Sequence, residues 1–270
     1  MFRIIICVKQ VPGTTEIKIN PETNTLIREG VETAINPFDS YAIEEGVALK
    51  ERLLAEDTEG EFEVVAVTMG PPQAESVLRE AISLGADRAV LLSDRAFAGA
   101  DTWATSLTLA RAVKQFSPWS LIILGKQTLD GDTGQVGPEL AHILNVPFIG
   151  YASKVIDIKR NKITVKRLSE ERYETFEVKL PAAISVGKDI NIPRVPSLRG
   201  KLKAKNETIP VWIASDIGIE ENDAGLAGSF TQVIKIFTPK HEYEVKMIEG
   251  NPDAQSEVLF KKLRELNLIN

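Results

Sequence analysis

Short apolar runs alternate with helical patterns through the first two-thirds of the chain, and this alternation is what most limits its fold. The apolar runs lie at 3–9, 62–69, 88–93 and 121–125, each bounded by polar or glycine-containing segments. Between and after them, helical patterns cover 36–54, 72–85, 101–116 and 134–145. Strands that alternate with helices through short connections predict a parallel sheet with helices on both faces.

The ends of the expected helices carry recognisable signals. Asn36 is a candidate N-cap, followed by Pro37 at the first helical position and Asp39 in the first turn. Asp101 or Thr102 is expected to cap the helix over 101–116. We therefore expect these residues to lie where the chain leaves a strand and enters a helix.

Other segments depart from this alternation. Residues 16–30 predict a small hairpin after the first strand, and the alternating segments 152–168 and 172–186 predict an antiparallel pair with one solvated face. From about residue 190 the chain becomes rich in proline and basic residues, and a helical pattern closes it at 257–269. The expected division is an α/β core over 1–190, an extended arm over 191–235 and a C-terminal segment over 236–270.

Composition excludes several classes of protein. With 43% apolar but only 6% aromatic residues, the core is expected to consist mostly of Val, Ile, Leu and Ala. A net charge of −6 does not suit nucleic acid or anionic lipid. One cysteine and two histidines allow no internal disulfide and no closed zinc site of the usual kind, so no metal is expected. The apolar run at the N-terminus is too short for a signal sequence, which predicts a cytoplasmic protein without membrane insertion.

A glycine-rich stretch, "GKQTLDGDTGQVGPELAHIL" at 125–144, enters one of the expected helices. Its glycines at 131, 134 and 137 do not match the dinucleotide fingerprint, and no Gly-Lys-Ser/Thr closes it as a P-loop. An ordinary connection of about two to six residues explains so long a stretch poorly. In open parallel sheets, ligands bind beyond the carboxyl ends of the strands, where helices begin.

Several segments converge at that edge, and their small, hydroxyl and glycine residues suit the phosphates of a nucleotide. Each segment taken alone is better explained as a capped helix with a glycine turn. The candidate nucleotide-binding residues are Cys7, Asn36, Pro37, Phe38, Asp39, Met69, Asp101, Thr102, Thr105, Ser106, Gly125, Lys126, Gln127, Thr128, Leu129, Asp130, Gly131, Asp132, Thr133, Gly134, Gln135 and Val136.

No catalytic side chains stand out. The sequence contains no visible nucleophile system, no paired acids and no H-E-x-x-H motif. His142 reads as an ordinary helix residue and Cys7 as a small buried hydrophobe. If chemistry takes place here, a cofactor performs it.

The chain resembles the beta subunits of electron transfer flavoproteins over nearly its whole length. The resemblance is carried by "CVKQVP", "REGVETAINPFDSYAIEEGVALKE", "VTMGPPQAESVLREAISLGADRAVLL", "LGKQTLDGDTGQVGPELA" and "RVPSLRGKLKAKNETIPVW", in that order. It implies a three-layer α/β/α adenine-nucleotide-binding fold and a heterodimer with an alpha subunit that carries its own FAD. It also implies that Cys7, residues 36–39, Met69 and residues 125–136 surround the nucleotide.

The family has two branches, and two loops bear on the choice. "SDRAFAGADTWATS" at 93–106 and "DGDTGQVGP" at 130–138 resemble the electron-bifurcating branch of anaerobes. That resemblance implies an FAD that accepts hydride from NADH and sends electrons both to the alpha-subunit FAD and dehydrogenase and to ferredoxin or flavodoxin. The hydroxyls of Thr102, Thr105 and Ser106 would then serve a second phosphate. In the conventional branch the same site holds AMP as a structural ligand.

The basic segment carries a further expectation. Five basic residues lie around Leu198 in the sequence: Arg194, Arg199, Lys201, Lys203 and Lys205. Without the resemblance, this segment would be interpreted as a solvated loop. The resemblance makes it a recognition loop in which Leu198 and Arg199 dock an acyl-CoA dehydrogenase-type or lactate dehydrogenase-type flavoenzyme. The terminal helix is expected to pack on the alpha subunit, and electron transfer to require that subunit.

Three other classes fit less well. A non-redox adenine-nucleotide-sensing module of the universal-stress type would be shorter and would lack the basic segment. An adenylating enzyme needs an S-G-G-x-D-S loop after the first strand, and a two-domain NAD dehydrogenase needs a Rossmann fingerprint there. The chain instead reads "CVKQVPGTTE" at this place.

Overall fold

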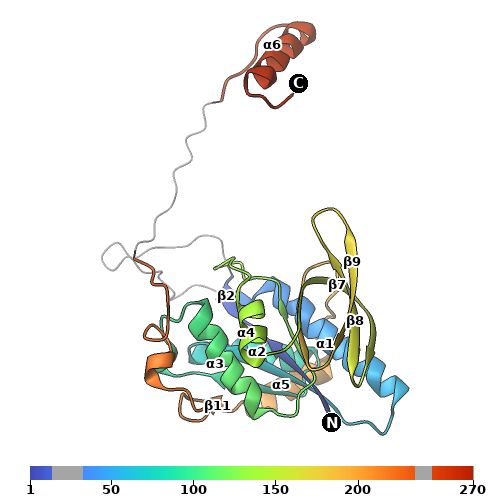
Figure 1. Cartoon of the computed structure of the whole chain (residues 1–270), viewed down its shortest axis with the longest axis vertical. Helices are drawn as coiled ribbons and strands as arrows, with labels where there is room; N and C mark the ends of the chain where they lie inside the picture. Colours follow the sequence, from blue (N-terminus) through green and yellow to red (C-terminus); the bar gives the residue numbers. More distant parts are fainter. Residues whose placement is uncertain (14–32, 235–244, 270) are drawn as a thin grey trace. The chain divides into compact units, whose positions relative to one another are not determined.

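The computed structural model describes residues 1–13, 33–234 and 245–269. By its internal contacts the chain forms two compact units, Met1–Ile234 and Lys235–Asn270 (Figure 1). The hairpin predicted over 16–30 lies outside the described residues. Two short strands, β2 (Gln10–Pro12) and β3 (Thr33–Ile35), pair antiparallel on either side of that gap.

A nine-stranded sheet forms the centre of the first unit, in the order β11-β5-β4-β1-β6-β10-β7-β8-β9. The strands from β11 to β7 run parallel to their neighbours, while β7, β8 and β9 are antiparallel. Their bounds are β1 (Phe2–Cys7), β4 (Phe62–Met69), β5 (Arg88–Leu92), β6 (Leu121–Gly125), β7 (Phe148–Lys159), β8 (Lys162–Leu168), β9 (Tyr173–Lys179), β10 (Ala182–Val186) and β11 (Val211–Trp212).

Helices cover both faces of this sheet (Figure 1). On one face pack α1 (Pro37–Glu56), α2 (Glu75–Leu84) and α5 (Leu198–Asn206), and on the other α3 (Thr102–Gln115) and α4 (Val136–Leu144). Successive residues of β1 point to opposite faces, so Ile4 and Ile6 join the first core cluster while Ile5 and Cys7 join the second. The predicted parallel sheet with helices on both faces is confirmed.

Short 3-10 turns complete the first unit: η1 (Pro72–Ala74), η2 (Arg95–Phe97) and η3 (Glu221–Asp223). The second unit contains α6 (Pro252–Glu265), which begins five residues before the helical pattern predicted over 257–269 and overlaps it as far as Glu265. No helix among the described residues is long and apolar enough to span a membrane.

One detail of the sequence-based expectation is wrong. The segment 172–186 does not form one strand of an antiparallel pair, because it divides at Leu180–Pro181 into β9 and β10. All five residues of β10 are buried, and the strand inserts between β6 and β7, parallel to both. A run of this kind needs neighbours on both sides to satisfy its backbone, which an exposed hairpin cannot supply.

The basic segment is also more ordered than its composition suggests. Residues 198–206 form α5, and Val211–Trp212 add β11 to the edge of the sheet beside β5. Ala204 and Ile209 are buried in the same core cluster as α1 and α2. The first compact unit therefore includes residues 191–234.

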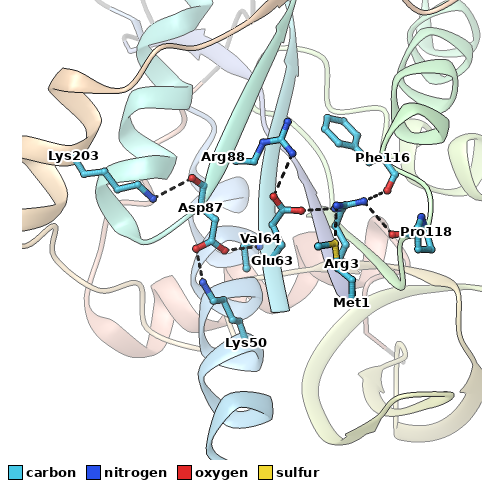
Figure 2. A network of polar contacts seen from close by, with 10 residues as sticks. All are labelled: Met1, Arg3, Lys50, Glu63, Val64, Asp87, Arg88, Phe116, Pro118 and Lys203. Carbon is cyan, nitrogen blue, oxygen red and sulfur yellow. Dashed lines mark hydrogen bonds and ion pairs between the residues drawn. The ribbon is translucent and has the colours of Figure 1, made fainter. Parts of the chain in front are cut away.

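Charged side chains form ion pairs and hydrogen bonds at the amino-terminal edge of the sheet (Figure 2). Arg3 on β1 reaches Glu63 on β4 with its Nε 2.5 Å from Oε2 and also donates to the carbonyl of Phe116. Asp87, just before β5, pairs with Lys50 of α1 and accepts from the backbone of β4. These contacts hold the edge opposite the one where the predicted nucleotide-binding segments lie.

Candidate functional site

The carboxyl ends of β1 and β6 lie side by side, and the chain leaves them toward opposite faces of the sheet. Cys7 at the end of β1 is in register with Leu124 of β6. The helix that follows β1 is α1 on one face, and the helix that follows β6 is α4 on the other. Such a switch point leaves a crevice at the carboxyl edge, the usual place for ligands in open α/β sheets.

Asp39, in the first turn of α1, ties these two strand ends together. Its Oδ2 accepts from the backbone N–H of Lys9 at 2.7 Å, and its Oδ1 from that of Gly125 at 3.2 Å. Oδ1 also accepts from Nδ2 of Asn36 at 2.9 Å. Gly125 is required at this place, because a Cβ there would clash with the Asp39 carboxylate.

Asn36 extends the same bracing into the glycine-rich loop. Its Nδ2 donates to the carbonyl of Gln127 at 2.9 Å, and its Oδ1 accepts from the backbone N–H of Leu129 at 3.3 Å. Asn36 occupies the predicted N-cap position, but its side chain makes no capping bond to α1. It binds the neighbouring loop instead, and the start of α1 keeps its N–H groups free of a side-chain cap.

The interior of this cluster perturbs its titratable groups. Burial raises the pKa of the Asp39 carboxyl from its ordinary 3.8 to about 7, although the hydrogen bonds from Asn36, Lys9 and Gly125 act in the opposite direction. Burial, with a smaller contribution from Asp39, raises the pKa of the Cys7 thiol to about 12. Cys7 is therefore a neutral thiol at neutral pH, which argues against a nucleophilic or redox role.

The loop over 125–136 is shaped by contacts of its own. Lys9 Nζ lies 2.7 Å from Asp130 Oδ2, and Gln127 Nε2 donates to Asp132 Oδ1. Asp132 and Gly134 have left-handed backbones, with φ of 53° and 64°. Burial acts to raise the pKa of Asp130, and the Lys9 ammonium acts to lower it. The net result is a pKa below the ordinary value. Together these contacts fold the loop back over the end of β6.

The loop leads into α4 without a side-chain cap. The first helical hydrogen bond there runs from Glu139 N to Gln135 O at 3.1 Å, so the N–H groups of Val136 and Gly137 precede it. Free N–H groups and the positive end of the helix dipole favour an anion at such a place. Both α1 and α4 therefore present uncapped N-termini at the switch point.

The start of α3 differs, because it is capped from within the protein. Oδ1 of Asp101 accepts from Ala104 N at 3.0 Å, which confirms the predicted cap. Oδ2 accepts from Phe230 N at 2.9 Å and from both the backbone N and the hydroxyl of Thr231 at 3.0 Å, while Asp101 N donates to Ser229. Asp101 thus anchors the segment 229–231, and its carboxylate offers no hydrogen-bond donor to a phosphate.

The hydroxyls of α3 also have protein partners. Thr102 Oγ1 lies 3.1 Å from one carboxylate oxygen of Glu139 on α4, and Ser106 Oγ 3.0 Å from the other. Ser106 is completely buried, and Thr105 lies half-buried between them on the helix. The hydroxyls of Thr102 and Ser106 therefore join α3 to α4 through Glu139. The sequence pattern did not reveal this role of Glu139.

Met69 ends β4 one strand away from the switch point. The next residue, Gly70, donates its backbone N–H to Leu92 O at 3.0 Å and so joins the ends of β4 and β5. Thr68 is buried, and among the described residues its hydroxyl has no hydrogen-bond partner. The structure thus gathers Cys7, residues 36–39 and the 125–136 loop into one cluster.

Comparison with known proteins identifies the family to which this site belongs. The model of the electron transfer flavoprotein domain matches residues 23–217, well over half of the chain. This chain belongs to the electron transfer flavoprotein family.

Full-length relatives place it within that family. The chain is 44% identical over 271 residues to the Caffeyl-CoA reductase-Etf complex subunit CarD of Acetobacterium woodii, with 99% of the chain and 100% of the relative covered. It is 41% identical over 269 residues to the electron transfer flavoprotein subunit beta of Thermoanaerobacterium thermosaccharolyticum, with the same coverage. Protein FixA of Bradyrhizobium diazoefficiens is 42% identical over 262 residues, covering 94% of the chain and 88% of the relative. The chain is therefore a beta subunit of this family.

In this beta subunit the predicted docking residues lie at the start of α5. Leu198 is 77% exposed and Arg199 is also exposed. Ser197 caps the helix through its hydroxyl, which accepts from Gly200 N at 3.0 Å. Gly200 packs so closely on α2 that a Cβ would clash with the carbonyl oxygen of Ser83.

Basic side chains on both sides of this exposed leucine bind neighbouring elements. Arg194 forms pairs with two acids of α1, at 2.8 Å from Glu44 Oε2 and 2.7 Å from Glu51 Oε1. Lys203 Nζ donates to the carbonyls of Ala86 and Asp87 at 3.0 and 3.1 Å. Two of the basic residues therefore position α5, while Arg199 remains on the surface with Leu198.

Proposed function

We propose that this beta subunit binds FAD at the carboxyl edge of its sheet and takes part in electron bifurcation from NADH. The observation that carries the proposal is the junction of β1 and β6, where Asn36 and Asp39 brace the glycine-rich loop between two uncapped helix starts. Such an arrangement suits the phosphates of a nucleotide. The resemblance of residues 93–106 and 130–138 to the bifurcating branch supports FAD as that nucleotide.

The residues present fit an adenine nucleotide in their chemistry. The N–H groups of Val136 and Gly137 would face phosphate oxygens, and Lys126 supplies a cation within the loop. Phe38 and Met69 add apolar surface for a planar base. When bound, FAD would accept a hydride, and thus two electrons, from NADH and release one electron toward each of two acceptors.

AMP is the alternative ligand, and one observation favours it. Thr102 and Ser106 bind Glu139, and Asp101 binds residues 229–231, so these groups are already partnered within the protein. They would have to exchange partners to serve a second phosphate. In that case the chain would be a conventional beta subunit with AMP as a structural ligand.

The proposed dehydrogenase partner is supported by two exposed residues and by the name of one relative. Leu198 and Arg199 suit docking of a flavoenzyme, because an apolar anchor beside a fixed charge is typical of interface hot spots. Since one relative is named as part of a caffeyl-CoA reductase complex, an acyl-CoA dehydrogenase-type partner is favoured over a lactate dehydrogenase-type one. The second acceptor would be ferredoxin or flavodoxin.

The C-terminal unit would provide the contact with the alpha subunit. Its helix α6 has no buried residue, and Val258, Leu259 and Phe260 are each 50% exposed. Large apolar side chains that are half-exposed around a helix need a covering surface. We propose that the alpha subunit supplies it and that the heterodimer acts in the cytoplasm.

Coupled kinetics of the complete complex test the proposal. The heterodimer is mixed with its dehydrogenase, NADH and ferredoxin under anaerobic conditions, and each acceptor is omitted in turn. Ferredoxin reduction should require the dehydrogenase substrate, and the isolated beta subunit should show almost no turnover. Rapid ferredoxin reduction without the second acceptor, or by the beta subunit alone, would contradict bifurcation.

A further inference from the structure

Tyr151 on β7 has an unusual backbone for a bulky residue. Its φ is 59°, in the left-handed region that aromatic side chains rarely adopt. The register between β10 and β7 shifts here, because Ile184 faces Ile149 whereas Val186 faces Ala152. An extra residue therefore bulges out of β7, and bulges of this kind redirect a side chain.

The bulge is held in place by a neighbouring strand. The backbone N–H of Tyr151 donates to the hydroxyl of Ser185 on β10 at 3.1 Å. The tyrosine ring is nevertheless 54% exposed, so core packing does not account for the conformation. Backbone strain that is maintained without a packing benefit points to a functional contact.

The bulge directs Tyr151 to the rim of a pocket of about 290 Å³. The pocket lies at the carboxyl ends of β6, β8 and β10, beside residues 151–153 of β7, and Phe38, Lys126, Leu168 and Lys188 also line it. Lys126 Nζ stands 5.0 Å above the centre of the Phe38 ring. The pocket thus combines apolar surface with the side chains of two lysines and of one acid, Asp189.

The pocket and the glycine-rich loop meet at Tyr151. A Cβ on Gly134 would lie 4.0 Å from the tyrosine hydroxyl and 3.4 Å from the carbonyl oxygen of Lys126. A ligand whose phosphates lie along the loop would therefore have the pocket within reach of its next portion. Because residue 134 is a glycine, no side chain there separates the loop from the pocket.

We propose that Tyr151 and this pocket receive the ring system that a dinucleotide carries beyond its adenylate, and so select FAD over AMP. The inference rests on the proposed function, because it takes the 125–136 loop as the phosphate site. The tyrosine ring offers a stacking face, and the ammonium groups of Lys126 and Lys188 complement ring carbonyl oxygens. AMP has no group that reaches this pocket, so its binding does not involve Tyr151.

Binding of FAD and AMP to the heterodimer tests this selection. The complex is stripped of its beta-site nucleotide with the alpha-subunit FAD retained, and each ligand is titrated by calorimetry. In Tyr151→Gly, FAD affinity should fall about tenfold, the usual effect of losing one aromatic stacking contact, while AMP affinity stays unchanged. Because glycine accepts a positive φ, the melting temperature should stay the same or rise.

Two further variants separate the contributions. Tyr151→Phe keeps the ring and should retain most of the FAD affinity. Tyr173→Ala is the matched control, since Tyr173 is similarly exposed at 59% but lies on β9 against Lys166. That variant should bind both ligands as the unmodified complex does.

The outcomes are distinct. Equal FAD affinity in Tyr151→Gly and the unmodified complex would overturn the inference and leave the proposed function intact. Unchanged affinities together with weaker association of the two subunits would overturn it in favour of a subunit contact. An unmodified complex that binds AMP but no second FAD would overturn both the inference and the proposed function.

Discussion

At the scale of single residues, Asp39 shows how one side chain organises the site. Its two oxygens accept from the backbone at the ends of β1 and β6 and from Asn36, which holds the glycine-rich loop. A buried carboxylate is unfavourable unless donors surround it, and this one has three N–H donors. Burial still dominates, because the pKa of Asp39 is raised to about 7.

This raised pKa predicts a pH-dependent stability. The folded chain binds the proton of Asp39 more tightly than the unfolded chain, so the stabilisation by this group is present below about pH 4 and is lost as the pH rises to about 7. Relative to Asp39→Asn, the unfolding free energy of the unmodified chain should fall by about 1 kcal/mol per pH unit across that range.

Chemical denaturation at a series of pH values measures this difference. Glu171→Gln, which removes an exposed acid in the turn between β8 and β9, serves as the control and should show no such slope. A pH-independent difference between the unmodified chain and Asp39→Asn would mean that Asp39 ionises at its ordinary pKa despite its burial.

At the scale of elements, α5 is a short helix held in place by specific contacts. Arg79 of α2 donates to the carbonyl of Ala204, Lys203 donates to the residues before β5, and Gly200 allows the backbones of α5 and α2 to approach. Most of its residues are polar and exposed, with Ala204 the one buried residue. Its position therefore depends on these contacts more than on apolar burial.

The close approach at Gly200 leads to an unusual expectation. Glycine to alanine in an exposed helix commonly stabilises by about 1 kcal/mol, but here the new Cβ would meet the Ser83 carbonyl. Gly200→Ala should therefore destabilise the chain by about 1–3 kcal/mol and displace Leu198. Electron transfer to the dehydrogenase should weaken in Gly200→Ala and in Leu198→Ala, and nucleotide content should be unchanged in both.

Thermal unfolding and steady-state kinetics with the dehydrogenase check this expectation. Lys201→Ala, an exposed change on the same helix, is the control for helix propensity and for charge. Normal turnover in Leu198→Ala would show that the docking surface lies elsewhere, and a more stable Gly200→Ala would show that α5 can move off α2 freely.

The sequence predicts elements well where one local signal decides them. The buried runs of β1, β4, β5 and β6 and the Asp101 cap can be read directly from their residues. The sequence does not reveal β10 or α5, because both depend on distant partners, β6 and β7 in one case and α2 in the other. Likewise the cluster of Cys7, residues 36–39 and the loop is predictable from the ends of strands, whereas the pairing of Thr102 and Ser106 with Glu139 is not.

At the scale of the whole molecule, the two edges of the sheet differ in character. The amino edge is closed by ion pairs among Arg3, Glu63 and Arg88, with Lys50 and Asp87 beside them (Figure 2). The carboxyl edge carries the loops, the uncapped helix starts and the bulge at Tyr151. Because ion pairs fix the amino edge of the sheet, the loops at the carboxyl edge are the place where a ligand is expected to bind.

The nucleotide content of the purified heterodimer tests the central claim most directly. The complex with the alpha subunit is denatured, and FAD and AMP are separated and counted by chromatography. We expect two FAD and no AMP per heterodimer, one FAD in each subunit. One FAD and one AMP would contradict the account, and the chain would then be the structural partner of a conventional electron carrier.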